Sequence, residues 1–161
     1  MKLNIILISA LLVISSCGYS MRGAINIPSS IKSVSVISKN YSQLVNILNS
    51  SLTSSNIGIS TSKAKDTYRI VILSEKFDRR QLSINISGRV NEYELIYNVN
   101  FELKVPNKEP VQDKITLYRD YSFDENNVMG NSDREDYIKK GMTSTVSTLI
   151  FNKFIASTKN Q

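Results

Sequence analysis

The clearest pattern in the chain is an alternation of apolar and polar residues between positions 93 and 105. One set of alternate positions is apolar throughout: Tyr93, Leu95, Tyr97, Val99, Phe101, Leu103 and Val105. The other set is polar except for Ile96. Because successive side chains of a strand point to opposite faces, this stripe predicts a long strand in a sheet with one packed and one solvated face.

Segments on both sides of this stripe predict further strands. Residues 32–38 carry alternating Val34 and Val36, and residues 68–77 are rich in Ile, Val and Leu. Alternation continues from the second segment as an arm that ends in a turn at Gly88; its apolar positions are Leu82, Ile84 and Ile86. A turn over 106–110 precedes a fourth strand, whose apolar face, interrupted by Arg119, comprises Ile115, Leu117, Tyr121 and Phe123.

Two segments have apolar residues at helical spacing. Asn40 is a plausible N-cap for the first, which we expect to run to about Ser55, with Gly58 as its stop signal. Its apolar positions are Tyr41, Leu44, Val45, Leu48 and Leu52. Ser132 and Glu135 form a capping box for the second helix. The stripe of this helix, which Gly141 weakens, comprises Ile138, Met142, Val146, Leu149, Ile150 and Phe154.

The element order β-α-β-β-β-α predicts an α+β fold. We expect two helices packed on one face of a mainly antiparallel four-stranded sheet, since each element must bury its apolar side. The fold should occupy residues 31–156 as one domain, with a short polar tail over 157–161.

The N-terminus has the pattern of a bacterial lipoprotein signal. Lys2 precedes an apolar run over 3–14, and small residues then lead to Cys17, the single cysteine of the chain. The run is shorter than the ~20 residues that span a bilayer, which disfavours a transmembrane helix. We interpret 1–16 as a cleaved signal peptide and 17–30 as the lipidated Cys17 with a linker; a buried core thiol is the alternative.

Composition excludes several kinds of chemistry. The 161 residues include no His and no Trp, and the one Cys is assigned to lipidation. Zinc sites built from Cys and His and nucleophile systems that use His are therefore excluded. An S-x-x-K match at 29–32 and the acidic residues around the last helix lack the context for acylation chemistry or an EF-hand. We expect no enzyme activity, no metal and no cofactor.

Charge adds a candidate binding site. The formal net charge is +6 at pH 7, which favours anionic partners such as phosphorylated lipid; nucleic acid is not expected for an exported, anchored domain. Four basic residues lie around the arm, beside its apolar strip: Lys76, Arg79, Arg80 and Arg89. Because Arg binds phosphate bidentately, this cluster is a candidate contact for anionic lipid. A solvated hairpin is the alternative.

Four stretches resemble the LPS-assembly lipoprotein family LptE. Residues 17–23 resemble the family's opening after its lipidated cysteine, and residues 91–95 with 99–100 resemble its central strand. Residues 119–124 resemble the end of the next strand, and 133–136 resemble the start of the last helix. The order and spacing of these short motifs carry the resemblance, which spans nearly the whole mature chain.

The resemblance implies a non-enzymatic lipoprotein of the outer membrane. Family members plug the β-barrel protein LptD, bind lipopolysaccharide, and assist its insertion into the outer leaflet and the assembly of the barrel. Gly18 after Cys17 is compatible with outer-membrane sorting. The chain departs from the family pattern at Ile86 and Asn131, where some members have basic residues; substitutes would be Arg79, Arg80 and Arg89. An adaptor or pilotin for another envelope machine, a lipid carrier and an envelope hydrolase are the rival interpretations.

Overall fold

The computed structural model describes residues 27–28, 30–61 and 66–159. In these residues the elements follow the order β1, α2, β2, β3, β4, β5 and α3. The strands are β1 (Ser33–Ser38), β2 (Gly58–Ile59), β3 (Tyr68–Ile84), β4 (Val90–Lys104) and β5 (Val111–Ser122), and the helices are α2 (Gln43–Ser54) and α3 (Val128–Lys159).

The strands form one mixed sheet with the order β2-β1-β3-β4-β5. β1 runs parallel to both β2 and β3, whereas β3, β4 and β5 are antiparallel. The α+β class and the two packed helices are confirmed, but the four-stranded sheet was wrong. The fifth strand, β2, has two exposed residues and is too short to show a period-two pattern.

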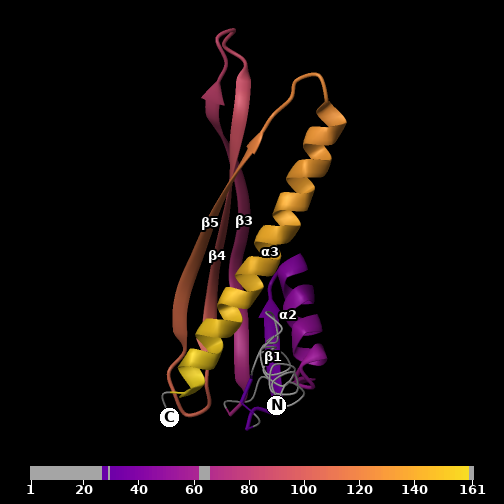
Figure 1. Cartoon of the computed structure of the whole chain (residues 1–161). Coiled ribbons are helices and arrows are strands. Elements are labelled where there is room, and N and C mark those ends of the chain that lie inside the picture. The colour runs from indigo at the N-terminus through magenta and orange to yellow at the C-terminus, as the bar shows by residue number, and fades with distance from the viewer. Residues whose placement is uncertain (1–26, 29, 62–65, 160–161) are drawn as a thin grey trace, which may run out of the picture.

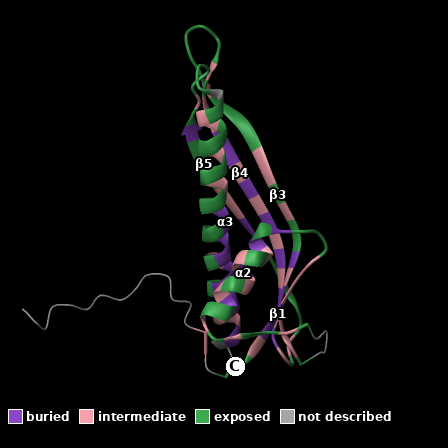
Figure 2. Ribbon diagram, turned by 90° about the vertical axis from the view of Figure 1, so that its right-hand side faces the viewer, coloured by how far each residue is buried: buried purple, intermediate pink, exposed green. Residues whose placement is uncertain are grey.

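Both helices lie on the same face of the sheet (Figures 1 and 2). α3 crosses β4 and β5 diagonally. α2 packs between β1 and the C-terminal half of α3. The β3–β4 hairpin extends beyond the helices at the opposite end from the C-terminal end of α3 (Figure 1). The domain is therefore elongated, and neither of its two described helices lies on the other face of the sheet.

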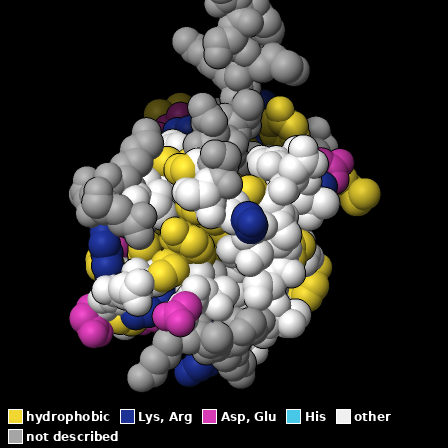
Figure 3. Space-filling model, turned by 90° about the horizontal axis from the view of Figure 1, so that it is seen from below, with side chains coloured by type: hydrophobic (Ala, Val, Ile, Leu, Met, Phe, Trp, Pro, Cys, Tyr) yellow, Lys and Arg dark blue, Asp and Glu magenta, His cyan; other side chains and the backbone are white. Residues whose placement is uncertain are grey.

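The core lies under the two helices and is built on β4. The predicted stripe is confirmed, because the residues from Leu95 to Val105 that face the helices are all buried. They pack against buried apolar residues of both helices: Leu44, Leu48, Leu52, Met142, Val146, Ile150, Phe151 and Phe154. Seen from below, at the end of the molecule where α3 ends, apolar side chains reach the surface among scattered charged residues (Figure 3).

The boundaries of α2 differ from the expected ones. Ser42, not Asn40, is the N-cap, and its Oγ accepts a hydrogen bond from the Val45 amide at 3.2 Å. At the other end, Asn56 takes the left-handed conformation with φ of 58°. Gly58 is not the stop signal, because it already belongs to β2.

α3 begins four residues before the expected capping box. Asn127 Oδ1 accepts a hydrogen bond from the Gly130 amide at 3.0 Å and so caps the first turn. Ser132 therefore lies inside the helix. The carboxylate of Glu135 is free to bond with other elements instead of with the N-cap.

Other segments are longer or better packed than expected. β3 and the predicted arm form one strand of 17 residues, and the turn at Gly88 is confirmed by its φ of 75°. α3 continues to Lys159 with Thr158 buried, so it includes most of the expected polar tail. Ile27, which we placed in the linker, packs against the core.

The expected signal peptide and Cys17 lie outside the described residues. None of the helices within the described ranges combines the length and apolar character needed to cross a membrane.

Truncation of the fully buried Phe101 to Ala should lower the free energy of unfolding by about 3–5 kcal/mol, because it leaves a cavity under both helices. Urea unfolding followed by circular dichroism measures this. Tyr118→Ala is the control, because Tyr118 lies on the uncovered face with 53% exposure; its effect should stay below about 1 kcal/mol. Equal losses would contradict the assignment of the two faces.

Candidate functional site

A shift in the register of β3 decides which of its charged residues face the helices. The pairing with β4 shifts just after Ile72, and such a bulge reverses the alternation of side chains. Phe77 consequently stacks on the buried Tyr97 ring with a centroid distance of 3.9 Å. Arg79 reaches α3 on the same face, whereas Lys76 and Arg80 lie on the uncovered face, opposite Asn98 and Glu94.

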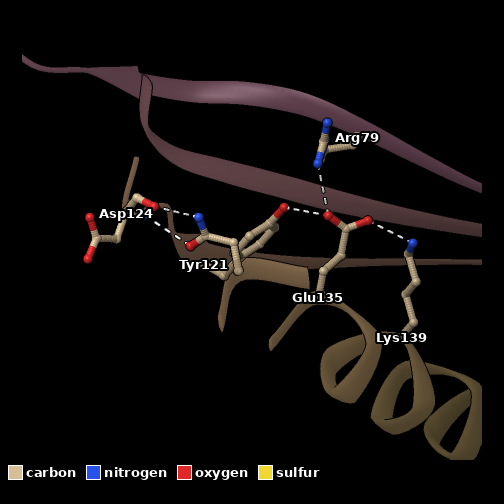
Figure 4. A network of polar contacts seen from close by, with 6 residues as sticks. Arg79, Tyr121, Asp124, Glu135 and Lys139 are labelled. Atoms are coloured by element: carbon tan, nitrogen blue, oxygen red, sulfur yellow. Dashed lines mark hydrogen bonds and ion pairs between the residues drawn. The ribbon is translucent and has the colours of Figure 1, made fainter. Parts of the chain in front are cut away.

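Arg79 belongs to a polar cluster centred on Glu135 of α3 (Figure 4). Its Nη1 donates to Glu135 Oε2 at 2.9 Å, and the Tyr121 hydroxyl donates to the same oxygen at 2.7 Å. Lys139 Nζ contacts Glu135 Oε1 at 2.7 Å. The guanidinium also lies 4.5 Å from the centre of the Tyr93 ring. The Glu135 cluster thus joins β3, β4 and β5 to the start of α3.

The cluster keeps Glu135 ionised. Desolvation raises the pKa of Glu135, but hydrogen bonds from Lys139, Tyr121 and Arg79 outweigh it and lower the pKa to about 2. Burial, reinforced by the bond to Glu135, raises the pKa of Tyr121. At neutral pH the carboxylate therefore offsets part of the combined positive charge of Arg79 and Lys139.

The other three predicted contact residues are also paired with carboxylates: Arg80 with Glu94 (2.5 Å), Lys76 with Asp78 (2.7 Å) and Arg89 with Glu125 (2.5 Å). The four residues do not converge on one site. Arg79 faces the helices, Lys76 and Arg80 lie on the other face, and Arg89 follows the hairpin turn. Their contact with lipopolysaccharide stays a prediction.

The tip of the hairpin is apolar and exposed. Ile84 and Ile86 are exposed, as is Leu82 below them. The turn itself is ordered, because Asn85 Oδ1 accepts hydrogen bonds from the Ser87 and Arg89 amides at 2.9 and 3.0 Å. The tip therefore presents apolar side chains to a partner from a defined turn.

Asn131, where the resemblance places a basic residue in some family members, has a structural role here. Its side chain donates to the Asp124 carbonyl at 2.6 Å and accepts from the Asp124 amide at 3.0 Å. These two hydrogen bonds stabilise the loop between β5 and α3.

The uncovered face of the sheet carries rows of polar side chains that bond across the strands: Asn100 with Ser74 (2.6 Å), Thr116 with Asn98 (2.8 Å), Ser83 with Glu92 (2.7 Å) and Gln112 with Glu102 (3.3 Å). We refer to this surface as the polar face. It is the solvated face that the period-two stripe predicts.

Sequence analysis missed one half-buried carboxylate, Glu75. Ser42 Oγ and the Tyr97 hydroxyl donate to its two oxygens at 2.5 and 2.6 Å. Burial is the largest cause that raises the pKa of Tyr97, and the hydrogen bond to Glu75 is the second. The only sequence signal was an acidic residue in an otherwise strand-like segment, and the register shift that turns it inward has no local signature. No group of three or more metal-binding side chains occurs within the described ranges.

Glu135→Gln should lower the free energy of unfolding at pH 7 by about 1–3 kcal/mol, because it leaves two cations around a partly buried neutral group. Since the pKa of Glu135 is lower in the folded state, its contribution is present above the unfolded pKa near 4.5 and is lost as the pH falls toward about 2. Urea unfolding of both proteins between pH 2 and 7 measures this difference. Glu125→Gln, which removes an exposed pair, should have little effect; a constant Glu135→Gln deficit at every pH would contradict the argument.

Comparison with known proteins identifies the fold and the family. The family model "LptE: Lipopolysaccharide-assembly" matches residues 31–154. The crystal structure of rare lipoprotein B from Shewanella oneidensis is 28% identical, with a TM-score of 0.75 over 80% of this chain and 97% of that chain. The solution structure of an uncharacterized lipoprotein B from Nitrosomonas europaea is 22% identical, with a TM-score of 0.72 over 88% and 93%.

A minor lipoprotein from Acinetobacter baumannii shares the fold at 20% identity, with a TM-score of 0.63 over 79% of this chain and 92% of that chain. Comparison with curated proteins yields no match. Because the family model covers almost all of the folded domain, this chain belongs to the LptE lipopolysaccharide-assembly family.

Proposed function

We propose that this protein is an outer-membrane lipoprotein that plugs an LptD-type β-barrel and assists lipopolysaccharide insertion into the outer leaflet. The observation that carries the proposal is the match to the LptE family over residues 31–154. The same role includes assistance in assembly of the barrel.

The polar face suits contact with a barrel lumen. The lumens of large outer-membrane barrels are polar, and the side chains of the polar face are amides, hydroxyls and carboxylates that bond to one another. Such groups exchange partners with a second polar wall directly or through bridging water. Neither α2 nor α3, the two helices of the described residues, covers this face (Figure 2), which leaves the polar side chains of β3, β4 and β5 available to such a wall.

Acylation of Cys17 would hold the domain at the membrane. Each buried methylene contributes about 0.8 kcal/mol, and stable anchoring requires more than one chain. A triacylated cysteine meets this requirement. In this proposal residues 1–16 are removed, residues 17–30 connect the anchor to the domain, and the domain faces the periplasm and the lumen.

Cys17→Ala should release the protein from the membrane without changing its fold, because the core is built from residues between Ile31 and Phe154. Fractionation of the envelope, followed by urea unfolding of the released protein, measures both effects. Ser20→Ala is the control and should remain in the membrane fraction. Persistence of the Cys17→Ala variant in the outer membrane, or mass spectrometry showing an unacylated, uncleaved N-terminus in cells, would oppose this localisation.

A bulky substitution on the polar face should weaken co-purification with the barrel in mild detergent. We expect Asn100→Trp to reduce recovery of the barrel severalfold and to increase permeability of the outer membrane. Asn152→Trp on the exposed side of α3 is the matched control and should change neither. Recovery of the wild-type protein without any barrel would contradict the proposal and favour an adaptor or pilotin role.

A further inference from the structure

Two basic residues outside the hairpin differ from the four described above, because neither has a carboxylate partner among the residues that the structure describes. Arg119 of β5 and Lys140 of α3 form no ion pair within the described part of the chain. Both line the same groove between β5 and α3. Their charges therefore remain available to an external anion.

In the described part of the fold, the sheet register places a paired arginine and an unpaired one, Arg119, on either side of the same residue. Leu95 of β4 is paired with Arg79 on one side and with Arg119 on the other. Both arginines thus flank the same buried leucine on the helix-covered face. Glu135 offsets the charge of Arg79, whereas Arg119 opens onto the groove.

The groove has an apolar floor and a volume of about 400 Å³. Ile138 and the buried Met142 line it, and the exposed Tyr137 stands at its rim. The groove is open beside Gly141, because a Cβ at this position would meet no atom within 4 Å. Glycine inside a helix costs about 1 kcal/mol relative to Ala, and no contact within the described fold requires it here.

An apolar floor below two cations fits an anionic amphiphile. The Arg guanidinium binds phosphate through two parallel hydrogen bonds, and Lys adds a point charge. We propose that this groove binds the phosphorylated, acylated end of lipopolysaccharide. One acyl chain lies over Gly141 along Ile138 and Met142, and a phosphate lies between Arg119 and Lys140. This inference rests on the proposed function, and it places the ligand on the helix side of the domain, away from the polar face.

Site-specific photocrosslinking in cells tests the location. The photoreactive residue p-benzoylphenylalanine replaces Tyr137 at the rim or, as the matched control, Tyr118 on the polar face, which is 53% exposed. The full-length lipoprotein should crosslink to lipopolysaccharide from position 137 and not from position 118. Gly141→Leu should reduce the crosslink about tenfold, because the new side chain fills the groove while helix propensity improves.

Charge variants in purified protein test the chemistry. The Arg119→Gln/Lys140→Gln double variant should bind purified lipopolysaccharide about tenfold more weakly in non-ionic detergent. The Lys114→Gln/Arg134→Gln control loses the same charge from two exposed residues outside the groove and should bind like the wild type. Inorganic phosphate should not compete with lipopolysaccharide for the groove. Dephosphorylated lipopolysaccharide should bind with the same low affinity to the wild type and to the groove variant.

Three outcomes would overturn the inference: equal binding by both double variants, a crosslink from position 137 to the barrel or to a phospholipid instead, or a crosslink unaffected by Gly141→Leu. Urea unfolding verifies that each variant is folded. If the barrel still co-purifies while these tests fail, the groove assignment fails and the plug role stands. If the crosslink persists without a barrel partner, the plug role fails and the groove assignment stands.

Discussion

The burial of one face of β4 is the constraint on which the rest of the fold depends. This strand pairs with β3 on one side and β5 on the other, and its inward residues from Leu95 to Val105 are all buried. A slip of one residue in either ladder would turn this stripe toward solvent. The register is therefore fixed over the whole sheet, and the apolar stripes of α2 and α3 have one surface on which to pack. The opposite face is left polar as a consequence.

The register shift after Ile72 divides the helix-covered face into two parts. Toward the chain termini the face is apolar, with Ile70 and Ile72 buried. Beyond the shift it carries Glu75, Phe77 and Arg79, whose partners are aromatic or polar. Hydrogen bonds and ion pairs replace apolar burial in this part, so the hairpin extends past the helices without a core of its own.

Sequence patterns predicted the strands and helices better than the strand pairings and side-chain contacts between them. The β4 stripe, both helices and the Gly88 turn follow from local periodicity. The parallel pairing of β1 with β3 and the cap at Ser42 do not, because they depend on contacts such as the bond from Ser42 to Glu75, 33 residues away. The basic cluster was visible as a loose group of Lys and Arg around the arm, but the charge of Arg79 is offset by Glu135, 56 residues later. Gly141 is a weak point of the helix in the sequence pattern, and only the structure shows that it lines the groove beside Arg119 of β5.

Neutralisation of charge, more than the number of cations, decides where this domain attracts an anion. An arginine beside an ionised carboxylate must give up that partner, or share it, before it binds a phosphate, and this exchange reduces the net gain. The four cations predicted as lipid contacts are in this position, so the exposed isoleucines at the tip offer apolar contact without a strong charge preference. The groove between β5 and α3 combines apolar surface with uncompensated charge. In the proposed role, the polar face is thus free to meet the barrel wall while a charged amphiphile is held on the helix side.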